Sequence, residues 1–512
     1  MVQNSLGRFI PEIYNGKKRI PYKTPNTIIP VGREYARPVK AFRPGDRKLL
    51  GSLREAIIAS GLKDGMTIST HHHLRNGDFL LNAIVKELDE LGIGNITIAS
   101  SSVHPVHAEL IPYIRKGVIT SLECGVNGLI GELATKGELD IPIIVRSHGG
   151  RARSMMTGEV KVDVAFIAAP CCDEYGNMNG YYGKSACGSL GYSHVDARYA
   201  DKVIAVTDNL VPHPVSPIAI SQTCVDYVVA VESLGDPAKI VSTTTKVTKD
   251  PIGLMIAKNT ADVIDASGLL KDGFSFQTGA GGTSLAVAEN VRRKMLEKNI
   301  KGSFGSGGIT GYFVEMLREG LFHTLMDVQC FDLNAVKSIG ENFNHQEISA
   351  DLYANPFNMG SIVNMLDVVI LGATEIDVNF NVNVNTESNG YLLHNTGGHT
   401  DTAAGAKLAI IVAPSIRGRL PIIMDDVITV TTPGENIDII VTERGIAVND
   451  KHPELKKELL KAKLPVKNIH DIKKEITDIT GVPRPVQFTD EIAALIEYRD
   501  GSIIDAVRRV KE

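Results

Sequence analysis

Two clusters of basic side chains each follow a short apolar run. One is STHHHLRNGD (69–78) and the other is VRSHGGRARS (145–154). Arginine forks and imidazoles are suited to binding carboxylates. We therefore expect a small polycarboxylate to be bound by these residues: His71, His72, His73, Arg75, His148 and Arg151.

Two other interpretations of these clusters stay open. Three consecutive histidines could suggest a zinc site, but they cannot all point at one ion from a single strand end. We therefore predict no metal. The alternative of a solvated surface loop, without a ligand, is not excluded by the sequence.

The second half of the chain contains three clusters of glycine: Gly279–Gly282, GSFGSGGITG (302–311) and HNTGGHTDTAAGAK (394–407). Bare amides at the start of a helix suit an anion or a developing oxyanion. Each cluster alone could be a tight turn, but three at expected strand ends favour a shared anion site. A dinucleotide site is poorly supported, because Ser284 occupies the third glycine position of G-x-G-x-x-G.

Nucleophile motifs are weak. Cys171 and Cys172 are adjacent, but no ordered Cys/His/Asn set accompanies them, so buried small side chains are expected. The chain has no G-x-S-x-G elbow, because Phe304 stands two residues before Ser306.

The elements that must position these residues alternate between short apolar runs and helical patterns. Uniformly apolar, β-branched runs predict buried strands, and they occur at 66–70, 95–100, 142–147, 163–170 and 202–208. Helical spacing occurs at 78–91 and 107–117. The pattern predicts an α/β fold with mainly parallel open sheets.

The two halves of the chain repeat each other. LKDGMTIST (62–70) returns as LKDGFSFQT (270–278), and three further pairs follow in the same order: 162–170 with 366–374, 201–208 with 406–413, and 225–233 with 437–445. The offset within a pair stays between 204 and 212 residues (367−163 and 438−226). An internal duplication of an α/β domain is therefore predicted, with a break near Asp236-Pro237.

We expect two related domains, 49–236 and 237–512, to pack about a pseudo-twofold axis. Ligands of open α/β sheets bind beyond the carboxyl ends of the strands, so the active site should lie in the cleft between the domains.

Residues 1–48 contain eleven Lys/Arg, three Asp/Glu and six prolines. This range is predicted to be a Pro-rich basic arm, either a surface strap or a guide for an anionic partner.

The composition narrows the class of protein. A formal charge of −5 argues against a general nucleic-acid binder. Six scattered cysteines in 512 residues, with no apparent signal peptide or membrane-spanning run, favour a cytoplasmic protein with no membrane association.

Several segments resemble the citrate lyase α-chain family over nearly the whole length. The most specific are HHHLRNGD (71–78), RSHGGR (146–151), PCCDEYGNMNG (170–180), GGHTDTAAGAKLAIIVAP (397–414) and VTERGIAVN (441–449). The layout of two related α/β domains also resembles the wider CoA-transferase fold.

The resemblance implies a transferase that exchanges acetyl for citryl on the thioester of an acyl carrier protein, releasing acetate. It implies a β chain that cleaves the citryl-carrier and a γ chain that is the carrier. We also expect self-association into a homo-oligomer. No cofactor would be bound by this chain itself, which would act on the phosphoribosyl-dephospho-CoA arm of the γ chain.

Related CoA-transferases carry an attacking glutamate where the alignment places Ser306. The resemblance therefore implies direct attack by a citrate carboxylate and a mixed anhydride. Glu387 would be the first candidate for an acyl adduct if one formed. The catalytic positions implied are Gly279, Gly281, Gly282, Ser306 and Gly307, and those implied to bind the thioester arm are Gly305, Gly308, Gly397, Gly398 and His399.

Two rival functions stay open: a free-standing acyl-CoA:carboxylate CoA-transferase, and a non-catalytic polycarboxylate sensor.

Residues 451–475 contain eight lysines. A solvated helical face is the ordinary explanation, and docking of an acidic carrier protein is the alternative.

Overall fold

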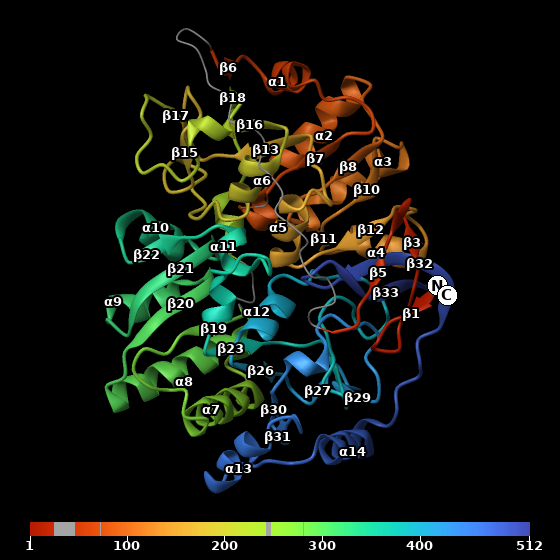
Figure 1. Cartoon of the computed structure of the whole chain (residues 1–512), viewed down its shortest axis with the longest axis vertical. Coiled ribbons are helices and arrows are strands. Elements are labelled where there is room, and N and C mark those ends of the chain that lie inside the picture. The colour runs from red at the N-terminus through yellow and green to blue at the C-terminus, as the bar shows by residue number, and fades with distance from the viewer. Residues whose placement is uncertain (25–46, 72, 242–246, 280, 512) are drawn as a thin grey trace.

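Two large sheets, one above the other in Figure 1, form the framework of the structure. The computed structural model describes residues 1–24, 47–71, 73–241, 247–279 and 281–511. His72 and residues 25–46 of the expected arm lie outside this described part. Within it, no helix is both long and apolar enough to cross a bilayer.

The first sheet has eleven strands in the order β5-β33-β32-β12-β10-β8-β7-β13-β16-β18-β6. All five strands expected in the first half are present in it: β7 (Thr67–Ser69), β8 (Ile96–Ile98), β12 (Ile143–Val145), β13 (Val164–Ala168) and β16 (Lys202–Thr207). They belong to parallel ladders, as their unbroken apolar runs predicted. The other first-half strands of this sheet are β6 (Leu49–Leu50), β10 (Ile119–Leu122) and β18 (Tyr227–Ala230).

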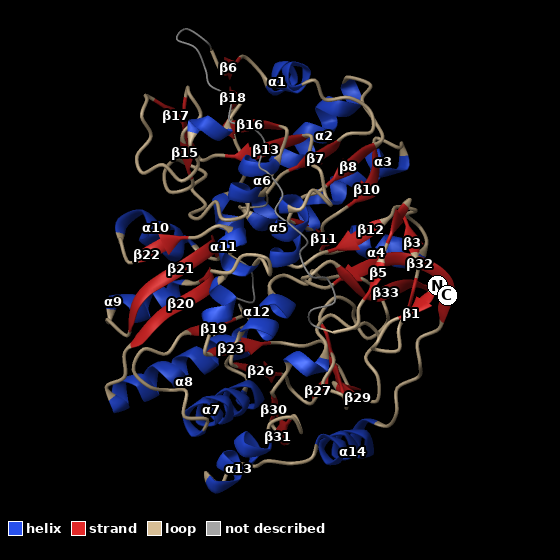
Figure 2. Ribbon diagram, viewed as in Figure 1, coloured by secondary structure: helices blue, strands red, loops and turns tan. Residues whose placement is uncertain are grey.

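Helices flank this sheet (Figure 2). The helix expected at 78–91 is α2 (Leu80–Glu90), and the one expected at 107–117 starts as a 3-10 turn and continues as α3 (Ile111–Arg115). The remaining helices of this half are α1 (Leu53–Ser60), α4 (Leu129–Lys136), α5 (His148–Met156) and α6 (Ser193–Tyr199).

The second sheet has eight strands in the order β22-β21-β20-β19-β23-β26-β30-β31. Their bounds are β19 (Phe276–Thr278), β20 (Gly302–Ile309), β21 (Phe322–Cys330), β22 (His345–Glu347), β23 (Val368–Leu371), β26 (Leu408–Val412), β30 (Ile439–Thr442) and β31 (Gly445–Val448). The helices are α7 (Pro251–Ala266), α8 (Gly282–Lys298), α9 (Gly311–Arg318), α10 (Leu333–Glu341), α11 (Ala350–Ala354), α12 (His399–Gly405), α13 (Pro453–Lys461) and α14 (Ile469–Thr480).

The internal repeat is confirmed by the strand order. The four repeated segments form β7-β13-β16-β18 in the first sheet and β19-β23-β26-β30 in the second, in the same spatial sequence. The correspondence extends outward, because β8-β10-β12 match β20-β21-β22 in the same order. The His-rich segment after β7 and the glycine-rich segment after β19 are therefore equivalent positions of the two halves.

The sheet membership of the C-terminus differs from the expected domain range of 237–512. β32 (Phe488–Glu497) pairs in parallel with β12 of the first sheet, and β33 (Ser502–Val510) pairs antiparallel with β32. Ala494, Leu495 and Ile496 are fully buried there. An apolar strand that covers a sheet edge removes exposed ladder groups, so burial accounts for this return of the chain.

The described part of the arm is more than a surface strap. β5 (Ile20–Pro21) extends the first sheet beside β33, and the side chain of Tyr22 is fully buried against Tyr498 at 5.0 Å between ring centroids. The short hairpins β1 (Val2–Gln3) with β2 (Phe9–Ile10) and β3 (Ile13–Tyr14) with β4 (Lys17–Lys18) precede it.

Residues 302–309 of the second glycine cluster form the strand β20 and not the turn expected at a strand end, and Thr310 is the N-cap of α9, which starts at Gly311. Gly302, Gly305 and Gly308 lie in β20, where an added Cβ would fall 2.3 Å from the Phe322 ring, 2.8 Å from the Phe313 ring and 2.1 Å from the Phe331 ring, respectively. These glycines are required because neighbouring aromatic rings occupy the space of their side chains.

The two halves meet through α5 and α6 on one side and α11 and α12 on the other (Figure 1). Asp401 in α12 accepts hydrogen bonds from Ser147 Oγ and from the Gly149 amide at the start of α5, both at 2.9 Å. Gly149 fits only because it has no side chain, since a Cβ would lie 2.0 Å from the carbonyl oxygen of Ala354 in α11.

Candidate active site at the contact between the two halves

His71 and His73 follow β7 and are buried together. His71 Nε2 lies 2.6 Å from Asp196 Oδ2, and His73 Nε2 lies 2.7 Å from Ser193 Oγ, both on α6. The two imidazole centroids are 5.5 Å apart. Nδ1 of each ring is buried and has no hydrogen-bond partner among the described residues, so both atoms are available to a ligand.

Arg151 holds this arrangement in place. Its guanidinium donates to both oxygens of Asp196, at 2.8 and 3.0 Å, and to the carbonyl oxygen of Ala99 at 2.6 Å. Burial disfavours the charge of Asp196, but Arg151 and His71 hold the pKa of its carboxyl well below the usual range. Arg151 therefore orients Asp196, which orients His71. Its expected contact with substrate stays a prediction.

Arg75 crosses to the other half. Its guanidinium carbon lies 4.7 Å from the centroid of the Phe331 ring, the ring that fills the space beside Gly308. Nη1 of Arg75 is buried without a hydrogen-bond partner in the described part of the chain. An arginine stacked on an aromatic ring keeps its charge and its donors for a carboxylate.

His148 contacts the third glycine cluster directly. Its main-chain amide donates to the carbonyl oxygen of Gly397 at 2.9 Å, and its ring lies 4.6 Å from that of Tyr192. The Tyr192 ring in turn stacks on His71 at 6.2 Å. The basic cluster and the glycine cluster are therefore linked by contacting side chains.

The three described histidines of the basic clusters, His71, His73 and His148, are uncharged at neutral pH. Burial lowers the pKa of His71 despite the opposing effect of Asp196, lowers that of His73 well below its usual value, and lowers that of His148 to about 3. They can therefore act as neutral donors or acceptors. Among the described residues that the sequence suggested as cations, Arg75 is the one with a fixed charge and a buried nitrogen without a hydrogen-bond partner.

The segment after β19 forms the expected strand–glycine–helix junction. Gly281 is the N-cap of α8, which starts at Gly282, and the Gly279 amide donates to the carbonyl oxygen of Ile370 at 3.0 Å. A Cβ on Gly279 or Gly281 would have its nearest neighbours at 3.8 Å. Packing does not require glycine there, in contrast to β20, so the bare main chain is left accessible to a ligand.

The end of β20 carries polar atoms without protein partners. Ser306 is 1% exposed, and neither its Oγ nor Thr310 Oγ1 has a hydrogen-bond partner among the described residues. Gly307 adopts φ +101, and a Cβ there would lie 2.6 Å from the Gln277 amide group. The Gln277 amide group therefore lies against Gly307 of β20, the residue that follows Ser306.

In the third glycine cluster (394–407), Gly398 lies close to Tyr353, and His399 forms hydrogen bonds within the protein. A Cβ on Gly398 would lie 2.7 Å from Tyr353 Oη. His399 uses both ring nitrogens inside the protein, with Thr432 Oγ1 at 2.8 Å and the carbonyl oxygen of Gly372 at 2.9 Å, and burial lowers its pKa to about 4. This ring orients the start of α12, and its predicted contact with the thioester arm stays a prediction.

The other candidate nucleophiles are the cysteine pair 171–172 and Glu387. Cys171 and Cys172 belong to the short strand β14 (Cys171–Asp173), and burial raises the pKa of both thiols. Glu387 is partly exposed and pairs with His394 Nε2 at 2.8 Å. Neither arrangement prepares a nucleophile.

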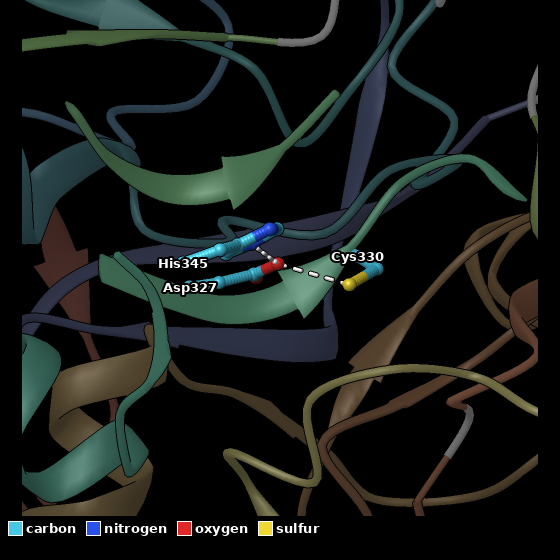
Figure 3. A group of neighbouring side chains, drawn as sticks. All are labelled: Asp327, Cys330 and His345. Atoms are coloured by element: carbon cyan, nitrogen blue, oxygen red, sulfur yellow. Dashed lines mark hydrogen bonds and ion pairs between the residues drawn. The ribbon is translucent and has the colours of Figure 1, made fainter. Parts of the chain in front are cut away.

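Figure 3 shows a buried network on β21 and β22. Asp327 Oδ2 accepts from His345 Nε2 and from Cys330 Sγ, each at 2.9 Å, and His345 Nδ1 lies 3.0 Å from Ser338 Oγ. The ladder between β20 and β21 shifts register beside Asp327, at Gly307 and Gly308. The network therefore stabilises the irregular part of β21 that leads to Phe331.

Sequence reasoning missed the residues that connect the clusters. Tyr192, Tyr353 and Phe331 have no local motif, and their roles depend on packing between the halves. Asp196 could have been suspected, because HVDARYADK (194–202) aligns with HTDTAAGAK (399–407) in the repeat, which pairs it with Asp401.

Comparison with known proteins gives consistent matches. The family model for "Citrate lyase, alpha subunit (CitF)" matches residues 46–510. The citrate lyase alpha chain of Haemophilus influenzae is 49% identical over 468 residues, covering 91% of this chain and 94% of that protein. A crystal structure of a citrate lyase α subunit from Streptococcus mutans, in complex with citrate, has a TM-score of 0.96 at 47% identity and covers 100% of both chains.

A more distant structure shares the fold alone. RipA from Yersinia pestis is 18% identical, with a TM-score of 0.60, and covers 84% of this chain and 96% of that one. The two related halves have the α/β, CoA-transferase-like architecture expected from the sequence. With a family match from residue 46 to residue 510, this chain belongs to the family of citrate lyase α chains.

Proposed function

We propose that the chain exchanges acetyl for citryl on a carrier thioester, converting acetyl-carrier and citrate into citryl-carrier and acetate. Its partners would be the β and γ chains of citrate lyase, and the thioester would be carried by the phosphoribosyl-dephospho-CoA arm of the γ chain. The S. mutans relative, whose crystal structure contains citrate, supports citrate as the carboxylate substrate.

One observation carries this proposal: candidate site residues of both halves hold buried polar atoms that have no hydrogen-bond partner among the described residues. Buried polar groups are normally hydrogen-bonded, so a group of exceptions needs an explanation. The buried atoms without partners in the described part of the chain include His71 Nδ1, His73 Nδ1 and Arg75 Nη1 from the first half, and Gln277 Oε1, Ser306 Oγ and Thr310 Oγ1 from the second. A polar ligand with several carboxylates could pair with both sets.

The reaction needs a nucleophile, and citrate can supply it. A citrate carboxylate oxygen attacks the acetyl carbonyl carbon, the C–S bond breaks, and the carrier thiolate leaves. The thiolate then attacks the citryl carbonyl of the mixed anhydride, the C–O bond breaks, and acetate leaves with one oxygen from citrate.

The protein contributes position and charge. Arg75 would bind a spare carboxylate, and His71, whose Nε2–H points to Asp196, would accept a hydrogen bond from the citrate hydroxyl at Nδ1. The accessible main chain of Gly281, at the start of α8, would face the oxyanions, whereas the Gly279 amide is held by the carbonyl oxygen of Ile370. The resemblance aligns Ser306 with the attacking glutamate of related transferases, which supports direct attack by substrate.

An exchange assay tests the proposal. The purified chain is mixed with citrate and either acetyl-carrier or acetyl-CoA, and release of acetate is followed together with formation of the citryl thioester. We expect exchange with both donors and a higher kcat/KM with the carrier. A higher kcat/KM with CoA would favour the free-standing transferase, and citrate binding by calorimetry without exchange would favour the sensor.

A further inference from the structure

Tyr353 places a hydroxyl group among the glycines of the candidate site. It lies on α11 and is 2% exposed, and its Oη accepts a hydrogen bond from Gln277 Nε2 at 2.8 Å. The hydroxyl oxygen also lies 2.7 Å from the position that a Cβ on Gly398 would take. It therefore sits between the end of β19 and the start of α12.

The neighbouring backbone fixes this hydroxyl. Gly307, at φ +101, leaves room for the Gln277 amide, and Gly398 leaves room for the phenol ring. A side chain at either glycine would displace the pair. Two of the three glycine clusters are therefore shaped around Gln277 and Tyr353.

The hydrogen bond from Gln277 leaves the phenolic hydrogen free to donate. A tyrosine hydroxyl has one hydrogen and can accept at its oxygen at the same time. Since Gln277 Nε2 occupies an acceptor position of Oη, the O–H can donate to a ligand. Burial raises the pKa of Tyr353, so the group stays protonated at neutral pH.

We propose that Tyr353 is a catalytic residue that donates this hydrogen bond to the oxyanion formed on the acetyl carbonyl, with Gln277 orienting its hydroxyl. This role rests on the proposed exchange reaction. No bond is made or broken at Tyr353, because the hydroxyl donates a hydrogen bond and keeps its proton. A donor that acts in the transition state should affect kcat more than ground-state binding of citrate.

The test compares Tyr353→Phe with Tyr498→Phe. Tyr498 is a matched control, because it is a fully buried tyrosine whose Oη accepts an amide hydrogen bond, from Asn436 Nδ2 at 2.7 Å. Loss of one oxyanion donor typically costs roughly 100- to 1,000-fold in kcat. We expect Tyr353→Phe to lower kcat by about 100-fold with less than about 3-fold change in KM for citrate. Tyr498→Phe should keep wild-type kinetics.

Gln277→Met provides the second arm. It removes the amide but leaves the hydroxyl, so we expect a smaller loss of kcat than in Tyr353→Phe. A larger loss in Gln277→Met would make the amide the donor and overturn the role of Tyr353. Wild-type kcat in a folded Tyr353→Phe, or a rise in KM with unchanged kcat, would also overturn it. No exchange by the wild-type chain would instead refute the proposed function, and with it this role.

Discussion

Gly149→Ala perturbs the contact between the halves most directly. The new methyl carbon would lie 2.0 Å from the carbonyl oxygen of Ala354 and 2.7 Å from Asp401 Oδ1. Ordinary contact starts at 3.4 Å, so α5 and α11 would have to separate by about 1.4 Å. This movement would strain the hydrogen bond from the Gly149 amide to Asp401.

The direction of the change in the free energy of unfolding distinguishes helix propensity from overpacking. Alanine inside a helix is normally more stable than glycine, by about 0.5–1 kcal/mol. Overpacking of a close contact costs about 1–3 kcal/mol. We therefore expect Gly149→Ala to lower the free energy of unfolding, although helix propensity alone would raise it.

Activity should suffer more than stability. His148 directly precedes Gly149, and its amide reaches Gly397 across the contact. A misplacement of about 1 Å can cost roughly 100-fold in rate, so we expect a loss of about that size in kcat/KM. The assays are urea unfolding and acetyl-to-citryl exchange. Gly360→Ala is the control, because Gly360 is exposed and its nearest neighbour would be at 3.5 Å. A Gly149→Ala variant as stable and active as wild type would refute the reasoning.

Three other predictions follow from the same contacts. Arg75→Gln should raise KM for citrate about 10-fold or more, because a charge-assisted hydrogen bond contributes about 1.5–3 kcal/mol; unchanged citrate binding by calorimetry would contradict this. Burial raises the pKa of Asp401 from 3.8 to about 6, so the folded state binds this proton more tightly than the unfolded state. The free energy of unfolding should fall by up to about 3 kcal/mol as pH rises through this window, and Asp401→Asn should lack that fall in denaturant titrations between pH 4 and 6. Glu387→Gln should keep wild-type kcat, and borohydride should trap no adduct on Glu387 of the wild-type chain, because Glu387 is partly exposed and paired with His394; a large loss of kcat or a trapped adduct would point to an acyl-enzyme.

The repeat could be predicted from the sequence because each buried strand kept its apolar residues in order. Local spacing also predicted the junction of β19 and α8, since a glycine run between a strand and a helix is a short-range signal. At 302–311 the same glycine signal led to the wrong prediction of a turn, because β20 continues through these glycines to Ile309. The rings that make glycine necessary there, from Phe313, Phe322 and Phe331, belong to other elements and come close only after folding.

The sequence indicated which clusters of residues to examine, but it did not predict which contacts their side chains make. Arg75 and His148 do contact the glycine-rich half, whereas the hydrogen-bond partners of His71 and His73 lie on α6 of the first half. Burial lowers the pKa of His71, His73 and His148, and Asp196 is the partner of Arg151. Tyr353 has no neighbouring motif, and its place depends on the packing of α11 against α5. Long-range packing also explains why the C-terminal strands join the first sheet, which no local pattern indicated.

The role of citrate as nucleophile can be measured by isotope transfer in a single turnover. The chain, in excess over its acetyl thioester substrate, is mixed with citrate labelled with ¹⁸O in its carboxylates, and the acetate is analysed by mass spectrometry. Direct attack predicts acetate that carries one citrate-derived ¹⁸O from the first turnover. Unlabelled acetate in that turnover would show that a protein carboxylate supplied the oxygen, which would contradict the account.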